Sequence, residues 1–450
     1  MTNRLQKKLP MLTMIFLGGL LIHFFVFTVV TRGVRLSASR LEILWLWKEI
    51  LVAAAGLLVV WFWFTSGRKK YLELNKKVRL WEFIFLLGIV VTASFSLLIH
   101  DQSIGQYFLA FKYDFLGFLI FFIWYHLGYF LSSEQRKNIF SWYGKVIKIA
   151  LIGAFVWYFI IFIKPGALKY FGYSTAVFEG KVGQQPPATY YTHLNQGLPR
   201  NQFLFERPIS RGFFLIAFWP LFFVLVIRKK SFEKTRVWRF LYAFNVIVTF
   251  SRAARGAWMV EVLVLGVISQ RKSLVRFGKY VILPLVLVLG LVGYLGREQI
   301  FYRDYSNTGH LKMVSQGIEK ISEKPRFGRG AGFAGPASHQ TEINTTATEY
   351  NPENQFLQII LEFGFIGFLF RGGLFARFLR LGFALVFSLS YKSLSASDSN
   401  RLLLSMSTGL LGLAISGLVL HSFTDRMIVY PFMALFGLIL THHLSEKKTH

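Results

Sequence analysis

The residues Met11-Leu-Thr-Met-Ile-Phe-Leu-Gly-Gly-Leu-Leu-Ile-His-Phe-Phe-Val-Phe-Thr-Val-Val30 form a run without a single charge, and this run decides the class of the chain. About 20 predominantly apolar residues suffice for a helix to cross the hydrocarbon core of a bilayer. Arg4, Lys7 and Lys8 precede the run as in a signal peptide, but no small-residue cleavage site follows it. We therefore interpret it as the first transmembrane helix.

The composition extends this interpretation to the whole chain. Hydrophobic residues make up 54% of the 450 residues, 49 of which are Phe, and the mean hydropathy is +0.47. The net charge of +29 sits in short clusters between apolar runs, which is typical of membrane topology rather than of nucleic-acid binding. The chain has no cysteine, which excludes disulfides, thiolate chemistry and iron-sulfur clusters.

Twelve apolar segments are long enough to be spans. They lie near 11–31, 45–65, 80–99, 107–131, 146–163, 209–227, 238–250, 256–269, 279–295, 365–390, 402–420 and 427–443. The sequence thus predicts an all-α polytopic membrane protein with about 12 transmembrane helices and a large extracytoplasmic loop carrying short surface helices.

Basic clusters set the expected orientation. Lys and Arg gather after the second, fourth, sixth and eighth spans, on the side of the N-terminus. The positive-inside rule makes that side cytoplasmic. Both termini are then expected in the cytoplasm, and loops 165–208 and 296–352 on the outer side of the membrane.

Four regions follow from this layout. They are residues 1–208 with the first helices and the first long outer loop, 209–295 with the central helices, 296–364 as a catalytic loop, and 365–450 with the last helices. Arg371, Arg377 and Arg380 interrupt the span at 365–390, which we interpret as one helix whose arginines snorkel or face protein. Gln355 to Phe363 is expected to form a separate amphipathic surface helix that ends at Gly364.

Several cations fall at outer span ends and suit a diphosphate, because guanidinium groups offer forked donors that match phosphate oxygens. They are Arg207, Arg211, Arg252, Arg255 and Arg303, with His310 nearby. Arg252 and Arg255 are three residues apart and so share one side of a helix. The alternative is that such arginines only anchor helix ends at lipid headgroups.

Glu353 is the predicted general base, although a carboxylate at a helix start also serves as an ordinary favourable charge. Glu362 is expected on the exposed side of the same helix. Lys112 and Asp114 are intramembrane charges, hence functional candidates or partners of one another. His421, Asp425 and Arg426, together with Asn354, are expected around the site. Residues Gly328 to Gly332 indicate a tight turn rather than a phosphate loop, and no metal-ligand spacing occurs among the histidines.

These residues resemble the O-antigen ligase and O-antigen polymerase superfamily, bacterial membrane glycosyltransferases that use polyprenyl-diphosphate-linked glycans. The likeness is carried by four elements: Arg211-Gly-Phe-Phe-Leu215; Thr249-Phe-Ser-Arg-Ala-Ala-Arg-Gly-Ala-Trp258; Ser306-Asn-Thr-Gly-His310 through Glu323-Lys-Pro-Arg-Phe-Gly-Arg-Gly-Ala-Gly332; and Glu353-Asn354 followed after nine residues by Gly364-Phe-Ile-Gly367.

The resemblance implies a metal-independent inverting transfer with no cofactor. The donor would be an undecaprenyl-diphosphate-linked glycan, the acceptor a glycan or glycolipid in the bilayer, and no nucleic acid would be involved. Two positions depart from the family pattern, because Glu353 replaces the expected histidine and His310 replaces an arginine. These departures favour a polysaccharide polymerase, while a ligase, a glycolipid flippase and a noncatalytic scaffold remain as alternatives.

Overall fold

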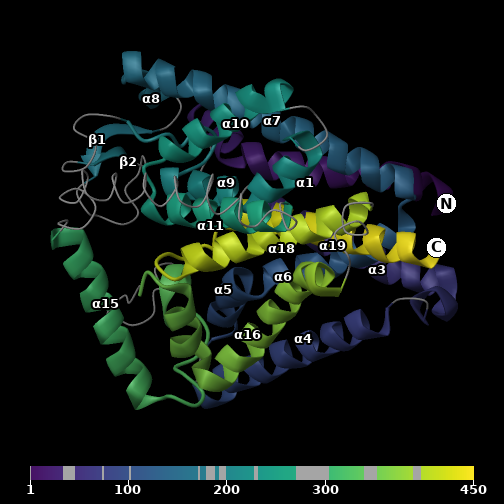
Figure 1. Ribbon diagram of the computed structural model, residues 1–450. Coiled ribbons are helices and arrows are strands. Elements are labelled where there is room, and N and C mark those ends of the chain that lie inside the picture. Colours follow the sequence, from purple (N-terminus) through teal and green to yellow (C-terminus); the bar gives the residue numbers. More distant parts are fainter. Residues whose placement is uncertain are drawn as a thin grey trace.

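The computed structural model describes residues 2–33, 46–72, 75–100, 103–170, 173–178, 188–191, 199–227, 232–269, 304–338, 352–388 and 397–449. Most of them are helical (Figure 1). The helices are α1 (Thr2–Gly33), α3 (Trp47–Leu72), α4 (Lys76–Ser94), α5 (Ile104–Asp114), α6 (Leu116–Phe130), α7 (Ser133–Ile163), α8 (Ala167–Tyr170), α9 (Pro208–Phe222), α10 (Phe232–Ile247), α11 (Arg252–Ser269), α15 (Asp304–Glu323), α16 (Gln355–Ser388), α18 (Asp398–Gly417) and α19 (Arg426–Thr449). Short π-helical segments, Phe95–Ile99 and Phe223–Ile227, continue α4 and α9, and Gly335–Ala337 is a 3-10 turn.

Among the described residues, seven helices are long and apolar enough to cross a membrane: α1, α3, α4, α7, α9, α16 and α19. The bent pair α5 and α6 would make an eighth span. The molecule is therefore an integral membrane protein of the helical class, whereas the number twelve is not confirmed. The expected spans at 238–250, 256–269 and 402–420 coincide with α10, α11 and α18, which fall outside those seven. The expected span at 279–295 lies outside the described residues.

The bundle has two distinct ends (Figure 1). Both chain termini lie at one end, which we call the terminal end. Helices α8 and α15 and the strands β1 (Ser174–Phe178) and β2 (Ala188–Tyr191) lie at the other end, which we call the loop end. The two strands pair in parallel and add a small sheet to a molecule that is otherwise helical. The sheet falls within the predicted 165–208 loop.

Helix α19 runs through the centre of the bundle and packs closely on α6. A Cβ on Gly437 would lie 2.4 Å from the Phe121 carbonyl oxygen, so only a glycine allows this approach of the two helices. The Thr441 hydroxyl donates to the Tyr125 carbonyl oxygen at 2.6 Å across the same interface. Small side chains and one interhelical hydrogen bond therefore join α6 to α19.

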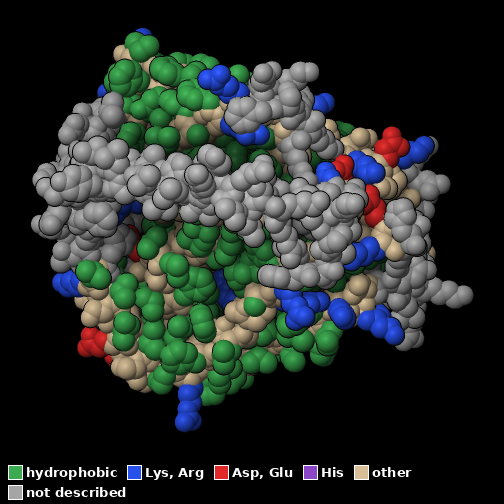
Figure 2. Space-filling model, in the orientation of Figure 1, with side chains coloured by type: hydrophobic (Ala, Val, Ile, Leu, Met, Phe, Trp, Pro, Cys, Tyr) green, Lys and Arg blue, Asp and Glu red, His purple; other side chains and the backbone are tan. Residues whose placement is uncertain are grey.

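Helix α4 lies at the edge of the bundle (Figure 1). Its Leu80, Phe83, Leu87 and Val90 side chains are exposed, and Figure 2 shows hydrophobic side chains spread over the side of the molecule on which α4 and α16 lie. An apolar surface of this extent is expected to face lipid. The α4 side of the bundle is therefore a lipid-facing side.

Two helices are broken at positions that shape the candidate site. Helix α5 begins with a capping box between Ser103 and Gln106 and ends at Asp114, where the chain bends by 62° into α6. Helix α16 is interrupted at Gly364, with φ 64° and ψ −171°, a conformation that glycine adopts far more readily than other residues. The expected helix end at Gly364 is confirmed, and 365–388 continues as one helix, as predicted. The expectation that residues 355–363 form a surface helix is wrong, because most of their side chains, among them Gln355, Gln358 and Leu361, are buried.

Candidate functional site at the loop end

Asn354 fixes the beginning of α16. Its side-chain oxygen accepts hydrogen bonds from the backbone N–H groups of Phe356 and Leu357 at 2.9 and 3.0 Å. This is the N-cap arrangement that satisfies free donors at a helix start. The side-chain nitrogen of Asn354 donates to the Leu418 carbonyl oxygen at 2.7 Å. Asn354 therefore joins the start of α16 to the turn that follows α18.

Glu353 directly precedes this cap and has a positive φ of 47°. Residues other than glycine adopt such a φ uncommonly, and they retain it where the surrounding structure holds them. The side chain is half-buried. The structure thus places Glu353 directly before the first turn of α16, at the positive end of a helix dipole.

The turn from Leu418 to Asp425 connects α16 with the start of α9. The Asp425 carboxylate accepts hydrogen bonds from the Ser210 side chain and from the Met427 N–H group, the latter at 3.2 Å. Burial raises the pKa of Asp425, and these hydrogen bonds counteract part of that rise. His421 lies half-buried in the same turn. Asn354, Asp425 and α9 therefore meet around one turn.

Arg211 lies in the first turn of α9 and is completely buried. Its Nη2 atom donates to Asn245 Oδ1 of α10 at 2.7 Å, and its guanidinium carbon lies 5.7 Å from the centre of the Phe203 ring. Its Nε and Nη1 atoms have no acceptor among the described residues. Because buried guanidinium donors normally have acceptors, these two atoms point to an anionic partner.

A second arginine, Arg200, lies close to the predicted pair Arg252 and Arg255. Arg200 is buried, and its Nε atom donates to the Thr249 carbonyl oxygen at 2.9 Å. Burial, followed by the positive charges of Arg200 and Arg252, lowers the pKa of Arg255. Like charges influence one another in this way only when they are near. The structure therefore gathers three arginines at the start of α11.

Helix α9 begins directly against this group. A Cβ on Gly212 would lie 2.8 Å from the Ala254 Cβ and 3.6 Å from the Ser251 Cβ. The start of α9, with Arg211, thus packs on the first turn of α11. Arg252 is exposed at that turn. Four arginines therefore lie in one neighbourhood, which we call the arginine group: Arg200, Arg211, Arg252 and Arg255.

The remaining predicted cations are placed less centrally. Arg207 is the exposed residue before α9, with its Nη2 atom 3.5 Å from the Glu206 carboxylate. His310 lies within α15, and the structure describes its backbone alone. Arg303 lies outside the described residues. The structure thus gives no contact between these residues and the arginine group.

Glu362 belongs to a buried cluster at the two helix breaks, so the expectation of an exposed side chain is wrong. Glu362 lies near Asp114, and Asp114 Oδ1 lies 2.8 Å from Arg371 Nη1. Gln358 donates to Glu362 Oε1 at 3.3 Å. The ion pair between Asp114 and Arg371 therefore joins α5 to α16, with Glu362 buried beside it.

The glycine-rich segment 328–335 packs on this cluster. Arg329 and Gly330 donate from their N–H groups to the carbonyl oxygens of Leu361 and Glu362 at 2.8 and 2.9 Å. The Ala334 N–H group donates to Glu362 Oε1 at 3.3 Å. Gly328, Gly330, Gly332 and Gly335 all have a positive φ, which confirms the predicted turn. The loop is thereby attached to the last turn of the helix that Asn354 begins.

Lys112 does not pair with Asp114, because each has another partner. Lys112 Nζ lies 2.9 Å from Glu49 Oε1 of α3. Arg426 approaches the same carboxylate at 3.5 Å and lies over the Tyr113 ring at 4.8 Å. The predicted Arg426 thus contributes to an ionic cluster that joins α3, α5 and α19.

The part of the chain that the structure describes contains no group of three or more His, Asp or Glu side chains placed to hold a metal ion. The fold and this site define a helical membrane protein with an arginine group and a fixed carboxylate at the loop end of the bundle.

Residues 237–372 match the family model of O-antigen ligase. The match covers less than a third of the 450 residues. It includes Arg252, Arg255, Glu353 and Arg371. No curated protein matches the chain.

Two contributors were not found from the sequence. Arg200 stands in a long polar loop without periodicity, and only its place shortly before α9 could have indicated a role. The pairing of Asp114 with Arg371 joins residues 257 positions apart. An intramembrane carboxylate and an intramembrane arginine can signal such a pair, but the sequence does not say which charges meet.

Proposed function

We propose that this protein transfers a glycan from a polyprenyl-diphosphate donor to an acceptor sugar hydroxyl at the loop end. The observation that carries the proposal is the shared turn between α18 and α19, since it contacts both the cap beside Glu353 and the start of α9 with Arg211. A cationic group and a candidate base are thus held by one short piece of chain. The family match to O-antigen ligase supports the same class of reaction.

The arginine group serves the diphosphate. Arg252 and Arg255 hold its oxygens through forked contacts, Arg200 adds positive charge beside them, and Arg211 supplies the donors that lack an acceptor. As the anomeric C–O bond breaks, its electron pair leaves with the diphosphate, whose growing charge the arginines stabilise.

Glu353 serves the acceptor. The acceptor hydroxyl oxygen forms the new bond to the anomeric carbon from the face opposite the diphosphate, and its proton passes to the Glu353 carboxylate. Asn354 positions this group through the helix cap and its bond to Leu418. The outcome at the anomeric carbon is inversion.

The test of Glu353 uses the purified protein with lipid-linked donor and acceptor. Glu353→Gln keeps the shape and loses the base, so turnover should fall by about 10² to 10⁴. Glu319→Gln is the matched control, because Glu319 is an exposed residue of α15. Glu353→His should restore part of the turnover and move the pH optimum toward the imidazole pKa of about 6.5. Full turnover in Glu353→Gln would remove Glu353 from the mechanism.

The arginines are tested by replacement with lysine. Arg252→Lys and Arg255→Lys keep the positive charge but lose the forked contact, so turnover should fall. Arg401→Lys is the control, because Arg401 lies at the far end of α18 and pairs with Asp398. Unchanged turnover in both test variants would leave these arginines as anchors in the lipid headgroups.

The proposal also places the loop end of the bundle on the outer side of the cytoplasmic membrane. The chain has no cysteine, so a single introduced thiol reports without background. Ser338→Cys should react with an impermeant thiol reagent in intact spheroplasts, and Ser231→Cys should not. The reverse pattern would place the site in the cytoplasm.

A polymerase is the first candidate and a ligase the second. Glu353 and His310, at the positions where the ligase pattern carries histidine and arginine, favour the polymerase, whereas the family match itself favours the ligase. In a strain lacking the protein, loss of long chains with single units still attached to the final acceptor would indicate a polymerase. Accumulated long lipid-linked polymer would indicate a ligase.

A further inference from the structure

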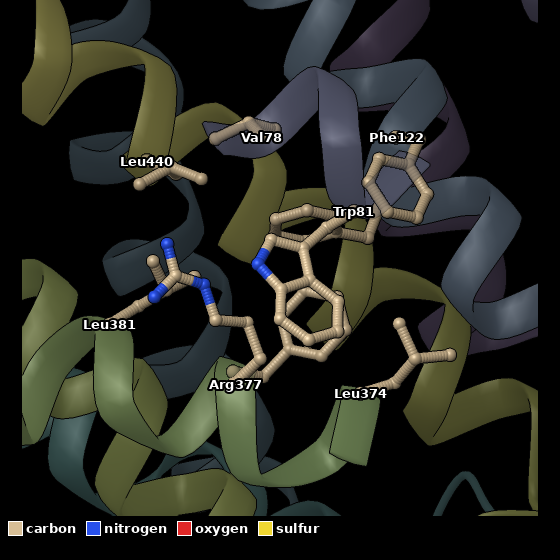
Figure 3. A pocket seen from close by; sticks show the side chains of 9 residues that line it. Val78, Trp81, Phe122, Leu374, Arg377, Leu381 and Leu440 are labelled. Carbon is tan, nitrogen blue, oxygen red and sulfur yellow. The ribbon is translucent and has the colours of Figure 1, made fainter. Parts of the chain in front are cut away.

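A shallow, open hollow lies between α4, α6, α16 and α19. Its walls include Val78, Trp81, Phe122, Leu374 and Leu381, and Arg377 is the one charged residue among them (Figure 3). Figure 3 shows the Arg377 side chain alongside the Trp81 indole, with its guanidinium group toward Leu440. The surface of the hollow is therefore apolar, and a single charged residue, Arg377, stands among the residues that line it.

The hollow is remote from the candidate site along α16 and α19, two of the helices that line it. Arg377 lies 13 residues after Gly364 in α16, which is about 20 Å at 1.5 Å per residue. Leu440 lies a similar distance along α19 from Arg426. Val78 and Trp81 belong to the first turns of α4, which begins with Lys76 and Lys77. With a hydrocarbon core of about 30 Å, the hollow falls in the leaflet at the terminal end.

The charge of Arg377 has no acidic partner within the described part of the chain. Its guanidinium carbon lies 5.7 Å from the centre of the Trp81 ring. Arg380 follows one helical turn later and is exposed. A half-buried cation at membrane depth is costly unless an anion or water accompanies it. An anion that accompanies Arg377 would therefore come from the lipid-facing side of the bundle.

We propose that this hollow binds an anionic phospholipid of the leaflet at the terminal end. The phosphate contacts the Arg377 guanidinium and the charge of Arg380, and the first part of one acyl chain lies against Trp81, Phe122 and Leu374. The same chemistry, a phosphate on an apolar tail, exists in the polyprenyl carrier. The phospholipid is favoured because the hollow lies across the membrane from the arginine group.

Trp81 provides the probe for the test. The full-length protein is reconstituted in vesicles of equal parts phosphatidylcholine and phosphatidylglycerol, with bromine on the acyl chains of one lipid at a time. The emission that Trp81→Phe removes is the Trp81 signal. This signal should be quenched more strongly by brominated phosphatidylglycerol than by brominated phosphatidylcholine. Equal quenching by both lipids would overturn the proposal.

Arg377→Gln should weaken the preference for phosphatidylglycerol about fivefold, as expected for one interfacial cation. Arg401→Gln should leave it unchanged, because Arg401 lies at the same end and is paired with Asp398. An unaltered preference in Arg377→Gln would contradict the assignment. Polyprenyl phosphate and unbrominated phosphatidylglycerol can each be added to displace the brominated lipid and relieve the quenching. If polyprenyl phosphate does so at the lower mole fraction, the hollow binds the polyprenyl carrier instead. Glycan transfer should persist in Arg377→Gln, so this test is separate from that of the proposed function.

Discussion

Arg371 and Arg377 lie six residues apart in one apolar helix, yet the structure uses them in opposite ways. Arg371 is buried and ion-paired with Asp114, and Glu362 is buried beside this pair. Arg377 is half-buried over Trp81, at the mouth of a hollow on the lipid-facing side. On a hydropathy scale each costs about 2.5 to 3.5 kcal/mol at a helix centre. The environments of Arg371 and Arg377 differ because a different helix faces each of them.

The facing helices explain the contrast. The bend after Asp114 places a carboxylate at the end of α5, against the inner side of α16. Helix α4 faces Arg377 with the Trp81 indole, whereas its carboxylate, Glu82, is hydrogen-bonded to His126. A buried ion pair contributes little net stability, but the loss of one partner leaves an uncompensated charge. The two arginines should therefore respond very differently to the same substitution.

The largest effect is expected from Arg371→Leu. It leaves Asp114 and Glu362 buried together without a guanidinium, which should lower the free energy of unfolding by about 3 to 5 kcal/mol. Thermal unfolding of the purified protein in detergent measures the loss. A variant as stable as the native protein would show that Asp114 is accommodated without Arg371.

Gly364→Ala should have the next largest effect. The alanine would have to adopt φ 64°, and its Cβ would lie 2.2 Å from the Arg326 carbonyl oxygen. Strain of this kind costs about 1 to 3 kcal/mol before the clash is counted. Gly372→Ala is the matched control, since a Cβ there meets nothing within 4 Å. It should be neutral or slightly stabilising. Equal effects at both positions would argue against the break at Gly364.

The pairing itself can be measured by a double-mutant cycle. Asp114→Leu combined with Arg371→Leu should lose less stability than the sum of the two single changes, by about 1 to 3 kcal/mol. The reason is that joint removal leaves no isolated charge between these two residues. Additive losses would mean that Asp114 and Arg371 act independently in the membrane.

The smallest effect is expected from Arg377→Leu. Removal of a half-buried cation without an acidic partner should change the free energy of unfolding by no more than about 0.5 kcal/mol, measured under the conditions used for Arg371→Leu. A loss as large as that of Arg371→Leu would show that Arg377 also has an internal partner and would end the contrast.

The sequence predicted those features that depend on neighbouring residues. The helix end at Gly364, the glycine turn and the membrane class all follow from local composition and period, and the structure confirms them. The sequence could not predict that Glu362 is buried, because the residues around a carboxylate in a helix do not show which other element packs against it. The partners of Lys112 and Asp114 come from α3 and α16, which are remote in sequence. To predict that Arg200 lies near Arg252 and Arg255, one would need to know that its loop packs against the start of α11.

The close packing of α6 against α19 has a consequence for biogenesis. The threonine of α19 that bonds Tyr125 is synthesised 316 residues later. At a synthesis rate of roughly 5 to 20 residues per second, α6 is in the membrane for about 15 to 60 s before α19 is made. During that interval the face of α6 that will contact α19 is open to membrane chaperones and proteases. A chain that stops before α19 never closes the face, so degradation of truncated products should be an intrinsic property of this topology.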